Sequence, residues 1–304
     1  MNAQTLADVD LPRSQTGANP QHLVLGLFTD HWSQAAEPLP SAALVALLSD
    51  FGSTPVSARA AIGRLARRGV LEAEKRGRRT YYRMTPGTAR VLEQTQRRMM
   101  EFGAPGRPWD GLWTTVVFSV PDEQRELRHV IRGRLRFLGY AAVYDGVWMS
   151  PRADHEQTAE LLRSVGVRSA TVLRSTLTHT QGDGDPLAAW DLDAIGAAYE
   201  EFIARYEELA GRTAAGQVGS AEALTARTKV KSEWLHMVST DPELPADLLP
   251  ADWPGHRARA VFARIYDTLG PLAEVRFRQI VAEQDPALAG EANHRTTDEH
   301  AKEP

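Results

Sequence analysis

The sequence predicts an α+β fold made of three successive parts. In the basic N-terminal part, three helical patterns precede a pair of strand-like runs. The middle part alternates between strand and helix patterns, and the apolar residues of the C-terminal part follow a helical period. The 304 residues exceed what one hydrophobic core usually holds, and 42% apolar and 24% charged residues are ordinary for a globular chain, so we expect several domains.

The N-terminal part begins with a polar stretch, residues 1–20, that has no apolar period and is expected to be disordered. A first helix is predicted from Gln21 to about Trp32, and a second helix is capped by Ser41. The third helix opens at Thr54-Pro55, because a hydroxyl at the cap and a proline at the first helical position favour a helix start. Its apolar residues share one face and its bases the other; the apolar set is Ala58, Ala61, Ile62 and Leu65.

Two strand-like runs, 70–74 and 80–85, follow the third helix and flank the basic sequence Lys-Arg-Gly-Arg-Arg. Gly77 supplies the backbone freedom that a tight turn needs. Three helices followed by a hairpin with a basic tip predict a winged helix-turn-helix over residues 21–86.

The charge distribution points to the same part of the chain. Residues 59–98 carry twelve bases and three acids, a net charge of +9, so the rest of the chain sums to −13. A basic module joined to an acidic body is typical of a nucleic-acid binder with a separate regulatory part. We therefore expect double-stranded DNA as the partner.

The third helix is the candidate for reading bases, because a major groove admits one helix and meets its N-terminal half. Arg59 can donate to guanine, while Arg64 and Arg67 flank the face and suit phosphates. The hairpin arginines would contact phosphate or the minor groove. The expected DNA-binding residues are Thr54, Val56, Ser57, Arg59, Ala60, Gly63, Arg64, Arg67, Arg76, Arg78 and Arg79.

Beyond the hairpin, residues 87–110 are predicted to form a linker helix and a hinge rich in glycine and proline. The strand–helix order of residues 111–181 predicts a ferredoxin-like domain. Residues 182–284 are expected to form a helical domain, and residues 285–304 a disordered tail.

Several chemistries are excluded or unsupported. The sequence has no cysteine, no P-loop, no dinucleotide fingerprint and no HExxH motif, and its nine histidines show no spacing typical of metal ligands. We expect no catalytic residues, no metal, no cofactor and no enzyme activity. The sequence shows no signal peptide and no apolar run that could span a membrane, so a cytoplasmic location is expected.

With these elements in place, the sequence resembles a known family. STPVSARAAIGRLARRG followed by VLEAEKRGRRTYYRMT resembles the DNA-binding part of the PaaX-type repressors of phenylacetate catabolism. FSVPDE and FLGYAAVYDGVWMSP resemble the family's middle domain, and WDLDAIGAAYEEFIARY and DPELPADLLPADWPG its C-terminal domain. The resemblance implies a homodimeric repressor of catabolic genes on an inverted-repeat operator, released by an aromatic acyl-CoA such as phenylacetyl-CoA. Val56 stands where a polar or basic residue is expected.

A CoA thioester needs cations for its phosphates and an apolar slot for its acyl group. We expect this effector between the middle and C-terminal domains, where arginines and aromatic residues occur together. The candidate effector residues are Arg128, Arg132, Arg134, Tyr144, Trp148, Trp190 and Arg205.

Two alternatives stay open. The middle domain is also similar to small CRISPR adaptation nucleases, so a metal-dependent nucleic-acid enzyme is one of them. Those nucleases need an aspartate at the end of the first strand, where this chain has Ser119, with Asp122 three residues on. The other alternative is a DNA-binding adaptor that has no effector.

Overall fold

The computed structural model describes residues 19–104, 108–181 and 184–298. Helices dominate, and two small antiparallel sheets accompany them, which confirms the predicted α+β class. The chain forms two compact units, which are described separately. Among the described residues, one unit holds 103–104, 108–181, 184–199 and 240–255, and the other holds 19–102, 200–239 and 256–298.

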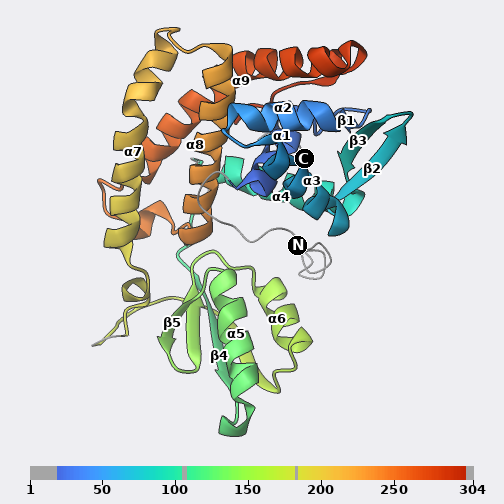
Figure 1. The fold of residues 1–304 in the computed structure, drawn as a ribbon. Coiled ribbons are helices and arrows are strands. Elements are labelled where there is room, and N and C mark those ends of the chain that lie inside the picture. The colour runs from blue at the N-terminus through green and yellow to red at the C-terminus, as the bar shows by residue number, and fades with distance from the viewer. Residues whose placement is uncertain (1–18, 105–107, 182–183, 299–304) are drawn as a thin grey trace. The chain divides into compact units, whose positions relative to one another are not determined.

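The second unit begins with three short helices and a hairpin (Figure 1). The elements are α1 (Pro20–His31), β1 (Leu39–Pro40), α2 (Ser41–Asp50), α3 (Pro55–Arg67), β2 (Leu71–Arg76) and β3 (Arg79–Met84). Their sheet has the order β1-β3-β2. The predicted cap of α2 is wrong: Pro40 is the N-cap, no side chain caps this helix, and Ser41 is already its first residue.

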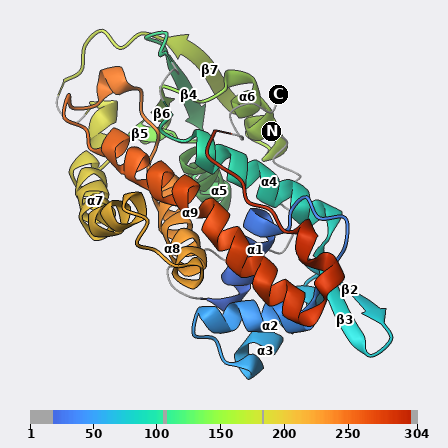
Figure 2. The ribbon, with the colours of Figure 1, turned by 90° about the horizontal axis from the view of Figure 1, so that it is seen from above.

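The same unit continues with long helices that enclose an aromatic core. Its helices are α4 (Pro86–Glu101), most of α7 (Leu192–Ala214), α8 (Ser220–Thr240) and most of α9 (Gly255–Gln284). Trp234 of α8 stacks on Phe262 of α9 with 5.0 Å between ring centroids. Figure 2 shows α9 passing along α1 toward the hairpin β2–β3.

The segment after α9 is ordered up to Asp298, so the prediction of a disordered tail from residue 285 is wrong for this part. A 3₁₀ helix, Pro286–Glu291, begins it, and Leu288 and Ala292 are buried. The sequence is polar, but its polar groups find partners in the fold: Thr297 donates both its N–H and its hydroxyl to Asp267. Residues 1–18 and 299–304 lie outside the described residues.

The first unit contains a four-stranded sheet with two helices. The elements are β4 (Trp113–Ser119), the 3₁₀ turn Asp122–Gln124, α5 (Arg125–Phe137), β5 (Ala141–Tyr144), β6 (Val147–Ser150), α6 (His155–Ser164) and β7 (Ser169–Ser175). All neighbouring strands are antiparallel, in the order β5-β6-β4-β7. Val116 of β4 and Trp148 of β6 are register partners in the core, where Leu135 of α5 and Leu162 of α6 pack against the sheet.

The remaining pieces of this unit are two 3₁₀ turns, Pro186–Ala189 and Ala246–Leu248, and the start of α7. The proline-rich segment between α8 and α9 contacts the sheet domain, because Arg152 Nε donates to the Glu243 carbonyl at 2.8 Å. No helix among the described residues is long and apolar enough to cross a membrane.

Candidate nucleic-acid interface

The start of α3 has the geometry that the sequence predicts. Thr54 is the N-cap in extended conformation, and its hydroxyl oxygen accepts a hydrogen bond from the Ser57 N–H at 3.2 Å. Pro55 occupies the first helical position, where no N–H is needed. The cap satisfies one of the free donors at this helix end, so the end stays folded while exposed to solvent.

The two faces of α3 separate as predicted. Ala58, Ala61, Ile62 and Leu65 are all buried, with no side chain more than 2% exposed. On the opposite face, Arg59, Ala60, Arg64 and Arg67 are exposed, and Gly63 and Ser57 are half-buried. Val56 is 76% exposed, the largest exposed fraction among the apolar residues that stand out on the surface. Arg59, Arg64 and Arg67 form no ion pair with another described residue, so their guanidinium groups are available to a ligand.

The hairpin has a two-residue turn, Gly77-Arg78, between the register partners Arg76 and Arg79. Gly77 has φ +62°, a conformation that favours glycine and that fits a tight antiparallel turn. Arg78 is exposed at the tip and has no ion-pair partner among the residues described.

The other two hairpin arginines are already engaged. Arg76 donates to Glu74 at 2.6 Å and to Glu37 at 2.8 Å, and its guanidinium lies 5.0 Å from the centre of the Tyr81 ring. The hydrogen bonds to these carboxylates raise the pKa of Arg76 and help to lower the pKa of Glu74. Arg79 donates to the Gln284 carbonyl at 3.1 Å. Sequence reasoning grouped all three arginines together, because Glu37 and Gln284 lie far away in the chain.

Behind the helices, a buried charge cluster connects α1 with α4, α8 and α9. One carboxylate oxygen of Asp30 accepts from Lys231 at 2.5 Å, from the Tyr266 hydroxyl at 2.8 Å and from Gln96 at 3.4 Å. Its other oxygen lies 3.6 Å from Arg227 Nη1. Burial would raise the pKa of Asp30, but the cations of Lys231 and Arg227 lower it well below its usual range.

Burial also changes the pKa values of the other members of this cluster. Desolvation lowers the pKa of Lys231 despite its contact with Asp30, and it raises the pKa of the Tyr266 hydroxyl. Asp30 remains ionised because it faces two cations. No sequence pattern marked this cluster, since Asp30 and Lys231 are 201 residues apart.

The predicted effector residues differ in their surroundings, each within its own unit. Arg128 donates to the Val120 carbonyl at 2.8 Å, and Arg132 pairs with Asp145. Arg134 and Tyr144 are exposed, whereas Trp148 is 1% exposed and belongs to the sheet core. Trp190 stacks on Trp113 at 6.5 Å. Arg205 pairs with Glu233 at 2.9 Å and belongs to the other compact unit.

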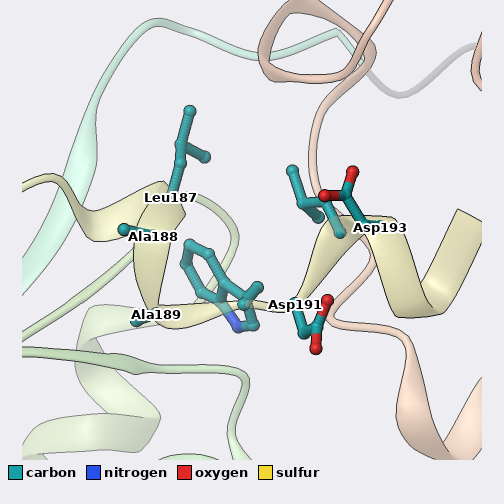
Figure 3. Close-up of a pocket in the computed structure, with 7 residues that line it drawn as sticks. Leu187, Ala188, Ala189, Asp191 and Asp193 are labelled. Carbon is teal, nitrogen blue, oxygen red and sulfur yellow. The ribbon is translucent and has the colours of Figure 1, made fainter.

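The first unit has an open hollow with a volume of about 510 Å³; Figure 3 shows side chains that line it, among them Leu187, Asp191 and Asp193. Leu187–Asp193 line it, and Asp191 and Asp193 contribute two carboxylates. No lining residue is a cation, so the hollow does not suit the phosphates of a CoA ester.

The described part of the chain offers no donor set for a metal. No group of three histidine, aspartate or glutamate side chains there is close enough together to hold an ion. Ser119 ends β4, and the side chain of Asp122 lies outside what the structure describes. The nuclease alternative therefore finds no metal site among the described side chains.

Comparison with known proteins identifies the family. Residues 19–87 match the model described as PaaX-like protein, residues 106–187 the PaaX protein central Cas2-like domain, and residues 190–279 the PaaX-like protein C-terminal domain. The chain belongs to the PaaX family. This family consists of transcriptional repressors, which are not enzymes, so the prediction that the chain is not an enzyme is confirmed.

Two individual proteins are similar over most of their length. Transcriptional repressor PaaX of Escherichia coli (strain K12) is 25% identical over 258 residues, which is 83% of this chain and 80% of that protein. The structure of Uncharacterized protein Rv0674 from Mycobacterium tuberculosis is similar with a TM-score of 0.58 and 21% identity, covering 87% of this chain and 99% of that one. The second similarity concerns the fold alone.

Proposed function

We propose that this protein is a sequence-specific DNA-binding transcriptional repressor. The observation that carries the proposal is the outer face of α3, where three exposed arginines surround small residues on a capped helix and have no ion-pair partner among the residues that the structure describes. The similarity to a protein named as a transcriptional repressor supports the same function.

We interpret α1–α3 with the sheet β1-β3-β2 as a winged helix-turn-helix in which α3 is the recognition helix. Three helices followed by a two-stranded wing support this interpretation. We likewise interpret the first unit as ferredoxin-like. Its element order, β-α-β-β-α-β, with β4 and β6 adjacent in the centre of the sheet, supports that interpretation.

On this proposal Arg59 contacts a base. It lies in the N-terminal half of α3, which enters the groove in helix-turn-helix proteins, and its fork of donors matches guanine O6 and N7. Val56 is exposed one turn earlier and can contact a thymine methyl group. Ala60 and Gly63 leave space for a close approach, and Arg64 and Arg67 would hold phosphates.

We further propose a homodimer on an inverted-repeat operator, because a two-fold dimer presents two recognition helices to symmetric half-sites. The sheet of the first unit carries α5 and α6 on one side, while Val117 and Leu173 are 40% and 45% exposed on the other. This apolar face supports the role of the unit in dimerisation. A protein that acts on chromosomal genes in this way would work in the cytoplasm.

The effector that we propose is an aromatic acyl-CoA such as phenylacetyl-CoA, which would release the repressor from catabolic genes. Release requires that the ligand binds more tightly to a conformation that does not fit the operator. The exposed Arg134 and Tyr144 are the members of the predicted effector set that are available on the surface of the first unit.

The direct test is a fluorescence-anisotropy titration with the promoter DNA that flanks the protein's own gene, with and without phenylacetyl-CoA. We expect tight, salt-sensitive binding that the thioester abolishes. An operator affinity that no aromatic acyl-CoA changes would favour an effector-independent adaptor. Affinity equal to that for random DNA would refute the repressor function at this promoter.

A pair of variants separates base reading from phosphate contact. Arg59→Ala should weaken operator binding by about 1–3 kcal/mol and leave binding to random DNA nearly unchanged. Arg78→Ala should weaken both and reduce the salt dependence. If Arg59→Ala weakens binding to the operator and to random DNA equally, Arg59 contacts only phosphate.

A further inference from the structure

The segment that follows α9 contacts three parts of the proposed DNA-binding module within one compact unit. We call residues 284–297 the C-terminal strap; it begins with Gln284, the last residue of α9, and continues through the segment that follows this helix. We propose that the strap is a positioning element for DNA binding, which fixes the hairpin β2–β3 through Tyr81 and Arg79. This inference rests on the proposed function and assigns a role in it to residues 284–297.

The hairpin contacts are made by its second strand. The Tyr81 hydroxyl donates to Asp285 at 3.0 Å, and Arg79 donates to the Gln284 carbonyl at 3.1 Å. Tyr81 is only 4% exposed, so its ring is packed while its hydroxyl reaches the strap. Arg79 and Tyr81 are two residues apart on a strand and therefore lie on the same face of the hairpin.

The hairpin needs such support. Beyond its own two strands it pairs only with β1, a strand of two residues, whose partners are Tyr81 and Tyr82. An isolated two-stranded ribbon is marginally stable in water, so its orientation depends on what holds its faces. Within the described part of the chain, the strap supplies hydrogen bonds to two side chains on one of these faces.

The strap also holds α1 and the loop that follows it. The Asn293 N–H donates to the His31 carbonyl at 3.2 Å, and the Asn293 carbonyl oxygen is 2.9 Å from His31 Nδ1. A carboxylate oxygen of Glu291 accepts from the Ala36 N–H at 2.9 Å. The strap therefore connects the hairpin to the helices behind it, independently of the turn between α3 and β2.

The strap is also fixed to α9 at its C-terminal end and within its second half. Thr297 is bound to Asp267, and Arg278 donates to the Ala292 carbonyl at 2.9 Å. On α9 itself, Arg276 makes two hydrogen bonds with Asp50 of α2, at 2.8 and 2.9 Å. Because α9 is bound to the helical module in this way, the strap holds the hairpin against a rigid support.

This arrangement also determines which arginine can reach DNA from the hairpin. Arg79 faces the strap, and Arg76 is held by Glu37 and Glu74. Arg78 remains at the tip. Lys75 on the first strand is exposed as well, but Arg78 is the cation at the turn, and a hairpin held at its second strand presents it in a defined place, which a phosphate contact requires.

The test compares Tyr81→Phe with Tyr82→Phe in the full-length protein. Both variants lose one hydroxyl from neighbouring residues of β3, but the Tyr82 hydroxyl has no hydrogen-bond partner among the described residues. Amide hydrogen exchange of the hairpin is measured first, without DNA. We expect Tyr81→Phe to accelerate exchange in residues 76–83 by about fivefold, the factor that one hydrogen bond contributes, and Tyr82→Phe to leave it unchanged.

The second measurement is operator affinity at several salt concentrations. Tyr81→Phe should lower it a few fold and flatten the salt dependence by up to about one phosphate contact, because Arg78 is no longer held in place. A loss of packing alone would change the melting temperature without a change in the salt dependence. Asp285→Ala should reproduce the effect of Tyr81→Phe, and the double variant should be no worse than either single one.

The proposal is overturned if the hairpin amides of Tyr81→Phe exchange as slowly as those of the wild type and of Tyr82→Phe. It is also overturned if the operator affinity of Tyr81→Phe has the same salt dependence as that of these two proteins. If Tyr81→Phe fails to fold, the same two measurements on Asp285→Ala decide the question. If the wild-type protein does not bind the operator, the proposed function fails, and the exchange comparison still shows whether the strap holds the hairpin.

Discussion

The buried charge cluster around Asp30 allows a quantitative prediction about stability. Asp30 is the single carboxylate between two cations, Lys231 and Arg227, and all three side chains are at most 9% exposed. Removing the carboxylate should therefore lower the unfolding free energy more than removing one of the cations. Asp30→Asn removes the only negative charge, whereas Lys231→Met removes one of two positive charges.

The contacts determine the expected magnitudes. After Asp30→Asn both cations are buried without a counter-ion, and breaking a buried pair in this way costs about 3–5 kcal/mol of unfolding free energy. After Lys231→Met, Asp30 keeps Arg227 at 3.6 Å and the Tyr266 hydroxyl at 2.8 Å. The loss is then closer to that of a charged hydrogen bond, about 1.5–3 kcal/mol.

Urea unfolding followed by circular dichroism measures these differences. Lys229→Met is the matched control, since Lys229 is exposed on the same helix and its loss should change stability by less than about 0.5 kcal/mol. The double variant Asp30→Asn/Lys231→Met should lose less than the sum of the single variants, because only Arg227 then lacks a counter-ion, and it keeps its hydrogen bonds to the Tyr266 and Arg295 carbonyls.

The reasoning is refuted if Lys231→Met destabilises the protein as much as Asp30→Asn does. That result would mean that Arg227, at 3.6 Å, does not compensate the carboxylate. An unfolding free energy of Asp30→Asn within 1 kcal/mol of the wild-type value, a margin of about the precision of such measurements, would likewise show that the cluster does not hold α1 in place.

Three further predictions concern the cap, the hairpin and acid stability. Thr54→Ala removes the hydroxyl that accepts from Ser57 and should lower the unfolding free energy by about 1 kcal/mol in urea; no change would mean that water caps the helix equally well. Glu37→Gln removes one of the two carboxylates that hold Arg76 and leaves this arginine freer to contact a phosphate. DNA affinity should therefore rise, and its salt dependence should steepen by up to about one phosphate contact. An anisotropy titration in which the variant matches the wild type at every salt concentration would contradict this. Burial, together with Arg227, lowers the pKa of His31 to about 3, below its value in the unfolded chain, so the unfolded state binds the proton first. The contribution of neutral His31 to the free energy of unfolding should then be fully present above about pH 6.5 and should decrease toward pH 3 by at most about 1.4 kcal/mol per pH unit. If the stability of a His31→Gln variant depends on pH as that of the wild type does, other groups cause the loss.

The local features of the proposed DNA-binding module could be predicted from the sequence. Thr54, Pro55 and the apolar spacing of Ala58–Leu65 define the start of α3 and its buried face, and the structure has both as predicted. Gly77 between two β-prone runs gives the hairpin and its turn. These features depend on residues within about one helical turn or one hairpin, so neighbouring residues determine them.

Features that depend on distant partners could not be predicted in this way. The sequence patterns predict separate domains for the N-terminal and the C-terminal helices. In the structure, residues 19–102 pack with most of α7, α8 and α9 in one compact unit. Whether a helix face packs on a sheet, on another helix or on a second chain is not encoded in its own period.

The candidate effector site shows the same limit. Arginine and aromatic residues near each other in the sequence suggested a pocket, yet Trp148 fills the sheet core and Arg132 pairs with Asp145. Composition indicates that cations and rings are present, but only the fold decides whether they face solvent, a core or a carboxylate.

The capped basic helix and the basic hairpin follow from the sequence, because they are local patterns of charge, caps and apolar period, and similarity along the whole sequence shows the family. The tertiary structure alone decided which charges remain available. It pairs Arg76 with Glu37, encloses Asp30 between Lys231 and Arg227, and places the strap against Tyr81. The physical reason is that a charge is neutralised by whatever the folded chain brings within a few ångströms, at any distance along the sequence.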